Sequence, residues 1–429
     1  MVKIIDNSLI LDEKINEYNK EQLLNEINEF FYIYLFKGYI INPSDVEISN
    51  LFNLDNNDLN ILKTVHFLLS DEINDLIENL PFLIRNLSHS TKKETEILKG
   101  HIKGKINWNQ TIKTRLTNGS NDQTLFVCHP PSKFYDLEEN QLLKFLLKKI
   151  VYLKRKFLDF NNLNTQIDIS NIDENLDWQE TIEINVYKIK KILKKVYFDE
   201  ITSIKRVTSK HLRKTYKNRN QLYHNVIKVF LLYEDLFILN KKEILKQLIE
   251  KRLITTFDDN KLYELYILFN LIKIFPKSKE LKLLYSDNSY VLKSEDNGII
   301  ITVYYQKIPE NLKTESKYLN ILNNYSINKK VKSPDIIIEF EKNGCQFYRL
   351  IEIKNSSDSD YIRESVYKVI GYYEDFKGKF THNFVENYPV VLIMWGGISL
   401  NNDYDPFNDE IIILNRLEYL KYVHKLIEL

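Results

Sequence analysis

The chain contains few cysteines, glycines and prolines, and it has no long apolar segment. Its 429 residues include 2 cysteines, 10 glycines and 9 prolines. Cys128 and Cys345 lie far apart, so they do not form the framework of a disulfide-rich secreted domain. No apolar run reaches the ~18 residues that a bilayer requires, and the start MVKIIDNSLI lacks a basic segment followed by an apolar one. We therefore expect a cytoplasmic protein with no membrane partner.

Clusters of metal-binding side chains and nucleotide-binding motifs are also lacking. The 8 histidines are scattered, and none forms a His-x-x-x-His pair or has a Cys-x-x-Cys partner, so a zinc site is not expected. The sequence has no glycine-rich P-loop and no Gly-x-Ser-x-Gly turn. The chain therefore carries no nucleotide-driven motor of its own.

The overall charge is close to neutral, but its distribution is uneven. The chain is 28% charged and 44% hydrophobic, which is ordinary for a soluble globular protein with room for two or three domains. Residues 1–80 have 5 basic and 15 acidic side chains, whereas residues 188–219 have 12 basic and 2 acidic ones. The basic block could neutralise phosphates along a nucleic acid. The alternatives are a solvated helix face and a surface that docks on the acidic N-terminal part.

Within this block, four residues are predicted to contact nucleic acid. They are Lys210, Arg213, Lys214 and Lys217.

Apolar periodicity divides the chain near residue 255. Region 1–255 is expected to bind DNA or a partner and to be mostly helical after residue 130. In it we expect an extended run in FFYIYLFKGYIINP, a helix broken at Pro81, and a strand leading into a helix over 101–116. Asp136 and Glu139 have the spacing of a capping box, which predicts a long helix from near residue 137.

Region 256–429 alternates between helix and strand patterns. KLYELYILFNLIKIF predicts a helix that ends before Pro276, and SDYIRESVYKVIGYYEDF predicts a second helix. NGIIITVYYQK and YPVVLIMWGG predict strands, and EYLKYVHKLIEL a final helix. The expected fold class is therefore mixed α+β. It has a largely helical N-terminal and middle region, followed by an α/β domain with helices on the faces of a small sheet.

The segment SPDIIIEFEKNGCQFYRLIEIKNS, residues 333–356, predicts a β-hairpin that carries acids. Asn343-Gly344 is a strong turn signal, because both residues of such a two-residue turn need positive φ. A two-residue turn pairs Lys342 with Cys345, so the residue numbers of any two facing positions add up to 687. Asp335 therefore lies opposite Glu352. Lys354 shares the face of Glu352, because side chains alternate along a strand.

Two facing carboxylates at the end of a hairpin repel each other, and a divalent cation would reverse that effect. Hard cations such as Mg²⁺ bind carboxylate and carbonyl oxygens. A neighbouring Lys354 could orient a water molecule or stabilise a developing charge. The alternative interpretation is a surface hairpin with scattered charges.

This order of elements, with acids at these points, resembles the PD-(D/E)xK nuclease superfamily. The matching residues are Asp335 after a proline, and the run Glu352, Ile353 and Lys354. The resemblance implies a restriction-endonuclease-like domain over 256–429. It implies a metal site made by Asp335, Glu352 and the carbonyl of Ile353, with Lys354 at the attacking water.

Members of this superfamily often add an acid on the first core helix, and Glu264 occupies that place. They also often add a polar and an aromatic residue on the helix after the second strand. Here Lys368 and Tyr372 stand four apart on one helix face. The resemblance implies that Glu264 binds the same cation and that Lys368 contacts a phosphate or orients Glu352, whereas Tyr372 is assigned to the core.

Upstream, GKINWNQT and EENQLLKFLL look like segments that precede such a nuclease in McrC-like restriction proteins. The resemblance covers about 90–429 and is weaker before 255. Asn107 stands where an acid is expected. We assign Gly104, Trp108 and Asn140 to turns and packing.

The resemblance implies a Mg²⁺-dependent endodeoxyribonuclease, with Mn²⁺ as a substitute metal. It would be the nuclease subunit of an McrBC-like restriction or phage-defence system, and its partner would be an AAA+ GTPase resembling McrB. Two alternatives remain open: a stand-alone DNA or RNA nuclease effector, and a non-catalytic nucleic-acid-binding scaffold with a decayed nuclease fold. The presence of Asp335, Glu352 and Lys354 argues against decay.

Overall fold

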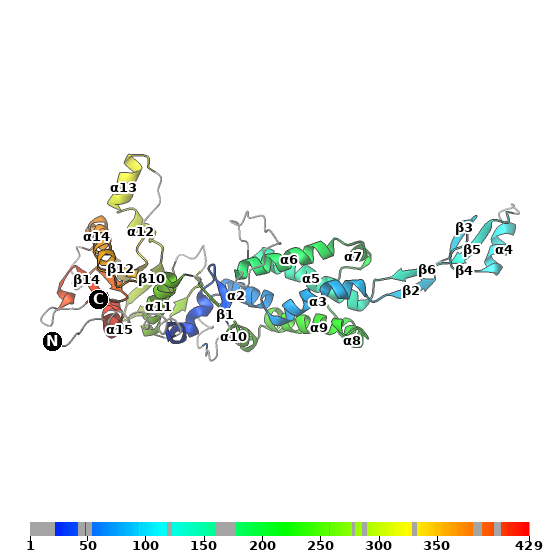
Figure 1. Ribbon diagram of the computed structural model, residues 1–429, viewed down its shortest axis with the longest axis horizontal. Helices are drawn as coiled ribbons and strands as arrows, with labels where there is room; N and C mark the ends of the chain where they lie inside the picture. Colours follow the sequence, from blue (N-terminus) through cyan, green and yellow to red (C-terminus); the bar gives the residue numbers. More distant parts are fainter. Residues whose placement is uncertain are drawn as a thin grey trace, which may run out of the picture. The chain divides into compact units, whose positions relative to one another are not determined.

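The computed structural model describes residues 22–41, 48, 54–93, 95–117, 122–158, 177–256, 258–276, 279–284, 290–327, 333–380, 388–398 and 405–428 (Figure 1). The chain forms two compact units. Unit 1 takes its described residues from 1–62, 172–179 and 242–429, and unit 2 from 63–171 and 180–241. The predicted functional boundary at 255/256 stays a prediction, since unit 1 draws on both sides of it. The first ten residues lie outside the described part of the chain.

Unit 1 is built around a seven-stranded sheet with the order β14-β13-β12-β11-β10-β9-β8. Neighbouring strands from β8 to β12 run antiparallel, whereas β12, β13 and β14 run parallel. The strands are β8 (Glu280–Leu281), β9 (Leu292–Asp296), β10 (Ile299–Tyr305), β11 (Ile336–Lys342), β12 (Cys345–Lys354), β13 (Val390–Met394) and β14 (Ile411–Asn415). Strand β12 lies inside this sheet, with β11 on one edge and β13 on the other.

The hairpin between β11 and β12 has the predicted turn and register. Asn343 and Gly344 have φ values of 52° and 80°, as a two-residue turn with positive φ at both positions requires. Lys342 pairs with Cys345, and the pairing continues without a bulge to Ile336 and Ile351. Every pair sums to 687, so the register prediction is confirmed.

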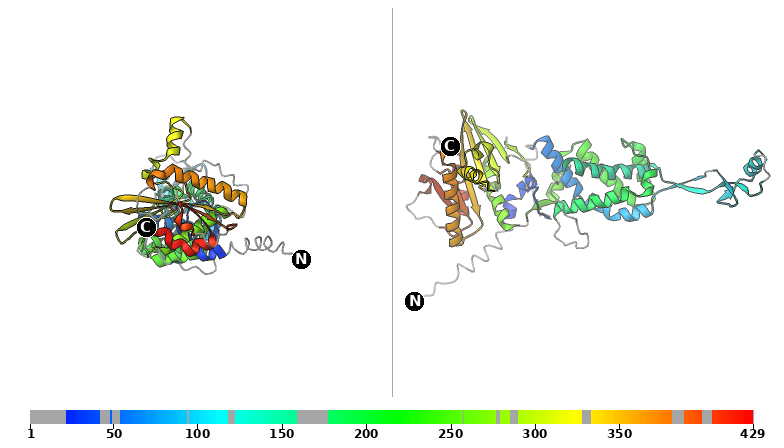
Figure 2. Two further views of the ribbon diagram at one scale, coloured as in Figure 1. Left: turned by 90° about the vertical axis from the view of Figure 1, so that its left-hand side faces the viewer. Right: turned by 90° about the horizontal axis from the view of Figure 1, so that it is seen from above.

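Helices cover both faces of the sheet. Helix α14 (Ser359–Phe376) packs Val369, Tyr372 and Phe376 on one face, against residues such as Ile337 and Leu350. Helices α11 (Asp259–Ile274) and α15 (Arg416–Tyr422) lie on the other face (Figure 2). These two helices are joined by the Tyr419 hydroxyl, which donates to the carbonyl of Ile267 at 2.8 Å.

The remaining elements of unit 1 surround this sandwich. They are η1 (Asn28–Ile33), β1 (Tyr39–Ile41), α10 (Lys242–Lys251), β7 (Leu253–Thr255), α12 (Glu310–Lys313), α13 (Lys317–Asn324), η4 (Lys377–Lys379), η5 (Pro406–Asn408) and η6 (Val423–Ile427). Strands β1 and β7 form a separate antiparallel pair. Helix α2 (Asn56–Leu68) begins in unit 1 and ends in unit 2.

Unit 2 is mainly helical. Its helices are α3 (Asp71–Arg85), α5 (Glu138–Phe157), most of α6 (Trp178–Leu193), α7 (Val196–Glu200), α8 (Ser209–Tyr216), α9 (Leu222–Tyr233) and the π-helical η3 (Glu234–Ile238). Helix α5 packs against α8 and α9, and α3 packs against α9. The predicted buried face of α5 is confirmed, since Leu142, Leu143, Leu146, Leu147 and Ile150 are all buried.

A two-stranded ribbon leads from these helices to a small sheet. The ribbon pairs β2 (Ser90–Lys93) with β6 (Pro131–Phe134). The sheet has the order β3-β5-β4, from β3 (Glu96–Lys99), β4 (Lys105–Ile106) and β5 (Leu125–His129), and α4 (Trp108–Thr117) packs on β5. The predicted strand and helix over 101–116 are thus confirmed, as is the mixed α+β fold class.

Three local predictions are wrong. Helix α3 continues through Pro81, because residues before and after it, from Ile73 to Ile84, bury one apolar face while the proline itself is exposed. The run expected to be extended begins in the 3₁₀-helix η1, so the prediction fails there, whereas strand β1 later in the same run agrees with it. No capping box starts α5, since its N-cap is Leu137; the carboxylate of Asp136 instead accepts bonds from Thr202.

None of the described helices combines the length and the apolar character needed to cross a membrane.

Candidate functional site

Asp335 lies directly before β11, where the chain enters the centre of the sheet. Its carbonyl accepts a hydrogen bond of 2.8 Å from the backbone N–H of Gln306, which fixes the main chain there. Its side-chain Oδ2 accepts a bond of 2.8 Å from the backbone N–H of Ile353 on the neighbouring strand. The carboxylate is therefore held at the C-terminal end of β12, as the hairpin register predicted.

Glu352 lies near the end of β12, between β11 and the parallel strand β13, where it faces Leu392. Its side chain is fully buried. Oε1 accepts hydrogen bonds from the ammonium groups of Lys354 and Lys368. Oε2 is also buried, and it has no hydrogen-bond partner among the described residues. An oxygen of a buried carboxylate without a partner is costly unless a ligand completes it.

Lys354 connects the two acids. Its Nζ donates to Oε1 of Glu352, donates to the carbonyl of Ile353 at 2.9 Å, and lies 3.7 Å from Oδ2 of Asp335. Burial alone would lower the pKa of Lys354, but the carboxylates of Asp335 and Glu352 outweigh that effect and raise it. The lysine is therefore a fixed positive charge at the point where both acids converge.

The surroundings of Asp335 disfavour the ionised form of its carboxyl. Burial raises the pKa of its carboxyl from 3.8 to about 7, and the nearby charges of Glu352 and Glu264 add to the increase. The ammonium of Lys354 and the N–H of Ile353 oppose it. The ionised form of Asp335 is thus destabilised in spite of Lys354, and a cation bound beside it would relieve this effect.

Helix α14 contributes a second lysine from the covering layer. Lys368 and Tyr372 lie four residues apart on its inner side, as the helical spacing predicted. The Lys368 ammonium reaches Glu352, and the Tyr372 hydroxyl donates to the carbonyl of Ser333 at 3.0 Å. Burial and the charge of Glu352 raise the pKa of Tyr372, so its hydroxyl stays neutral and serves to anchor the segment that leads to Asp335.

Glu264 comes from α11, and most of its side chain is shielded from solvent. Its Oε2 accepts hydrogen bonds from the Tyr305 hydroxyl at 3.1 Å, from Gln306 Nε2 at 2.8 Å and from Lys261 at 3.1 Å. It is close enough to Asp335 to raise the pKa of that residue. The predicted approach from the first core helix is therefore observed, but Glu264 is held by donors of its own and not by the other acids.

These residues fit a cation in part. The carboxylate oxygens and the Ile353 carbonyl are hard donors of the kind that Mg²⁺ prefers, and the unpartnered Oε2 of Glu352 offers a free ligand. However, among the described residues no three acid, histidine or cysteine side chains already surround one point. Direct protein ligation would thus come from two carboxylates and one carbonyl, which suits an ion that keeps several waters.

The predicted nucleic-acid contacts lie on α8 and just after it, in unit 2. Arg213, Lys214 and Lys217 are exposed and line a hollow of about 680 Å³. Arg219 and His89 also line it, and sequence reasoning did not single them out for this role. Lys210 differs, because its ammonium pairs with Glu138. The structure therefore brings three of the four predicted cations together around one hollow.

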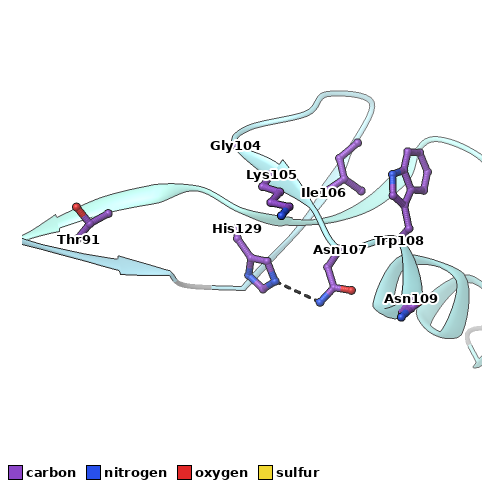
Figure 3. Close-up of a pocket in the computed structure, with 8 residues that line it drawn as sticks. All are labelled: Thr91, Gly104, Lys105, Ile106, Asn107, Trp108, Asn109 and His129. Atoms are coloured by element: carbon purple, nitrogen blue, oxygen red, sulfur yellow. Dashed lines mark hydrogen bonds between the residues drawn. The ribbon is translucent and has the colours of Figure 1, made fainter.

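A second hollow, of about 640 Å³, lies on the small sheet and was not expected from the sequence (Figure 3). Asn107 and His129 face each other across it, with Nδ2 and Nε2 3.2 Å apart. Trp108 lines the hollow and is 56% exposed, and its ring packs edge-on against that of Phe126 with the centroids 6.3 Å apart. Gly104 does occupy a turn, with φ of 81° and a Cβ position that the His129 carbonyl would block.

Asn140 has the packing role that was expected. It is fully buried, its amide donates to the carbonyls of Ser88 and Tyr135, and its oxygen accepts from the Tyr223 hydroxyl.

No protein-family model and no curated protein matches the chain. Among solved structures, it is similar to a chain in the half-complex from the tetradecameric assembly of Thermococcus gammatolerans McrB AAA+ hexamers with bound McrC. That match covers 83% of this chain and 67% of the other, with 12% identity and a TM-score of 0.24. A chain in the cryo-EM structure of the T. gammatolerans McrBC complex matches over 47% of both chains, with 14% identity and a TM-score of 0.24. This chain thus spans about half the length of that second neighbour.

Proposed function

We propose that the chain is a metal-dependent endonuclease that hydrolyses DNA phosphodiesters, with the site at Asp335, Glu352 and Lys354. The observation that carries the proposal is the convergence of these three side chains at the end of β12. One buried carboxylate oxygen is left without a partner there. A cation bound at this point would satisfy that oxygen.

Asp335, Glu352 and the carbonyl of Ile353 would hold a Mg²⁺ or Mn²⁺ ion, with Glu264 behind Asp335. When bound, the ion supplies Lewis-acid stabilisation of phosphate charge and lowers the pKa of a bound water. Lys354 is placed to orient the attacking water and to stabilise the charge that develops on the phosphate. Its contacts with both acids fix the ammonium before substrate arrives.

Lys354 and Lys368 both donate to one oxygen of Glu352, so the metal-free site holds two positive charges against that carboxylate. A bound cation would itself neutralise the Glu352 carboxylate, which would then no longer require Lys368 as a counter-charge. Because Lys368 comes from a helix and is still partly exposed, it can turn outward to a phosphate oxygen. We therefore assign Lys368 to substrate phosphate and Lys354 to the reacting water.

DNA would be held in part by the cations around the α8 hollow, Arg213, Lys214 and Lys217, with Lys210 released from Glu138. The proposal that an AAA+ GTPase resembling McrB supplies the motor rests on the sequence resemblance to McrC-like proteins. It agrees with the lack of a P-loop in this chain. The system would then be an McrBC-like restriction or phage-defence system.

The test is cleavage of supercoiled plasmid, linear duplex DNA, single-stranded DNA and RNA by the full chain, with Mg²⁺ or with EDTA. Each reaction is run with and without the AAA+ GTPase candidate and GTP. DNA cleavage that requires Mg²⁺ and disappears in Asp335→Ala and Lys354→Ala supports the proposal. Cleavage of RNA alone would overturn the assigned substrate, and cleavage by both variants would overturn the assigned site.

A further inference from the structure

A hollow of about 380 Å³ lies on unit 2, between α5 and the segment that follows α7. Four of the eight residues that line it are lysines, and none is acidic. It shares no lining residue with the α8 hollow, so it is a separate feature of the helical unit. The lining residues that matter below are Lys144, Lys148, Lys149, Tyr152, Ser203 and Lys205.

Two contacts from α5 fix the walls of the hollow. Lys144 and Lys148 stand four residues apart and therefore lie along one side of the helix. Lys144 is buried, and its ammonium donates to the carbonyl of Phe198 and, at 2.6 Å, to the carbonyl of Ile201. One turn further along, Lys148 donates to Oγ of Ser203 at 2.7 Å. The segment after α7 is thus tied to the helix at two points, which makes the hollow a built part of the fold.

Neighbouring positive charges destabilise one another in this hollow. Burial lowers the pKa of Lys144, and the charge of Lys148 lowers it further, although Asp199 and Asp136 act in the opposite direction. An anion bound in the hollow would favour the charged form of both lysines.

The other lysines of the hollow also lack acidic partners. Among the described residues, no acid forms an ion pair with Lys148, Lys149 or Lys205, whereas Lys154 elsewhere on α5 is paired with Glu183. An ammonium group has three N–H donors, and Lys148 uses one of them for its contact across the hollow. These lysines therefore have donors left for the oxygens of phosphate groups.

A partly exposed aromatic ring stands beside the lysines. Tyr152 is 42% exposed, and the ammonium groups of Lys149 and Lys156 lie 5.5 and 5.8 Å from the centre of its ring. Arg155 and Lys156 continue the positive charge along the exposed side of α5. The helix rises about 12 Å from Lys148 to Lys156, so the cations extend past the hollow. A positive track that contains an aromatic ring is the combination by which proteins hold single strands of nucleic acid.

We propose that the hollow and the α5 face beyond it bind a single strand of nucleic acid. Lys148, Lys149 and Lys205 bind phosphates of the strand, and one unpaired base stacks on Tyr152. The bases of a duplex are stacked on one another and offer no free face to this ring. A free phosphate compound would occupy the hollow but would not use the cations beyond Tyr152. The site is distinct from the candidate nuclease site and from the cations on α8, and binding there requires no cleavage.

The test is fluorescence anisotropy of the full chain with labelled oligo(dT) or oligo(U) of about 15 nucleotides, in EDTA so that no metal-dependent cleavage occurs. Tyr152→Ala should raise Kd at least about fivefold, and Tyr152→Phe should stay within about twofold of wild type, because a phenyl ring still stacks. Replacing Lys148, Lys149 and Lys205 by glutamine should weaken binding. It should also lower the slope of log K against log salt by about two, at about 0.7 for each of three phosphates. Lys144 is kept in every variant, because it holds the segment after α7.

Helix α6 supplies matched controls, because it too carries an exposed tyrosine among exposed lysines. Tyr187→Ala should leave the affinity unchanged. Replacing Lys188, Lys190 and Lys191 by glutamine should leave both the affinity and the salt slope close to those of wild type. Circular dichroism and thermal unfolding confirm that each variant is folded.

Binding of either strand that depends on Tyr152 and on the three lysines supports the proposal. Oligo(dT) and oligo(U) are measured separately, since DNA and RNA share the phosphates and the stacking bases that the site would recognise. A wild-type chain that binds neither strand overturns the proposal, as do wild-type affinity in Tyr152→Ala and equal losses in the α6 controls. Two further results would also overturn it. One is an equal loss of duplex affinity in Tyr152→Ala, and the other is competition by tripolyphosphate as strong as that by unlabelled strand at equal phosphate concentration.

Discussion

The ammonium group of Lys368, on α14, donates a hydrogen bond to the buried carboxylate of Glu352, on the central strand β12. This contact joins the covering helix to the sheet at the point where Asp335 and Lys354 also meet. The candidate site therefore combines side chains from the sheet with one from the covering helix. Asp335, Glu352 and Lys354 come from the hairpin, and Lys368 comes from α14.

Alanine substitution of single site residues should lower cleavage to different extents, according to the role of each side chain. Lys354→Ala and Asp335→Ala should each lower the cleavage rate by at least about 10²-fold, because each removes several kcal/mol of transition-state stabilisation. Lys368→Ala should have a smaller effect, mainly on KM, if Lys368 contacts substrate phosphate. The measurement is single-turnover cleavage of a labelled duplex in Mg²⁺. Lys342→Ala, at the far end of the same hairpin, is the control and should cleave as wild type does.

Mg²⁺ should stabilise the protein through the same residues. A ligand that binds only the folded state adds about 2.7 kcal/mol at a concentration of 100 times its dissociation constant. Wild type should therefore unfold at a higher temperature with Mg²⁺ than with EDTA. Asp335→Asn keeps the shape of the side chain but removes its charge, so it should show little of this gain. Equal shifts in wild type and variant would place the ion elsewhere.

The stability of the metal-free protein should fall as pH rises toward neutrality. The pKa of Asp335 is raised from 3.8 to about 7 by burial and by Glu352 and Glu264. The folded state therefore holds a proton that the unfolded state releases. Protonation of Asp335 contributes its full stability below pH 3.8, and that contribution is lost as pH rises through 7, at no more than about 1.4 kcal/mol per pH unit.

Urea unfolding of wild type and Asp335→Asn in EDTA, at several pH values from 5 to 8, tests this. The difference in unfolding free energy should shift in favour of the variant as pH increases. Parallel curves for the two proteins would show that Asp335 does not titrate in this window. With Mg²⁺ present, the trend should reverse for wild type, because the ion binds the ionised carboxylate.

The cations on and after α8 should bind DNA in a salt-dependent manner. Replacing Lys210, Arg213, Lys214 and Lys217 by glutamine should weaken binding and lower the slope of log K against log salt by about one for each phosphate that the variant no longer neutralises. The control replaces Lys190, Lys191, Lys194 and Lys195, which are also exposed and belong to the same basic block. Fluorescence anisotropy at several salt concentrations measures both sets. Equal losses of affinity would mean that the α8 hollow has no special role.

Local signals in the sequence were sufficient for the hairpin and for much of the site. Asn343-Gly344 defines the turn, and strand alternation then places Asp335, Glu352 and Lys354 together without any long-range information. Helical spacing in the same way places Lys368 and Tyr372 on one side of α14. These features depend on residues within one or two elements, and their geometry follows from backbone periodicity alone.

Features that depend on distant segments could not be read in this way. Arg349 has the position of an ordinary strand residue, but it is buried because its Nη1 donates to the carbonyl of Leu426 at 2.6 Å and its guanidinium lies over the ring of Tyr388. The capping role expected for Asp136 is replaced by bonds to Thr202. Tertiary contacts overrode the local pattern in both cases.

The tight turn at Asn343-Gly344 lies at the opposite end of the hairpin from the acids, yet it controls which acids meet. Inserting or deleting one residue there would shift the pairing of β11 with β12, and a shift by one sends alternate side chains to the other face. Glu352 would then be carried away from Asp335 although no site residue had changed. Length variation in this loop should therefore be rare among functional descendants of the chain, even though the loop is exposed and far from the chemistry. In laboratory evolution, a library with random loop lengths at this turn should retain activity almost only at two residues.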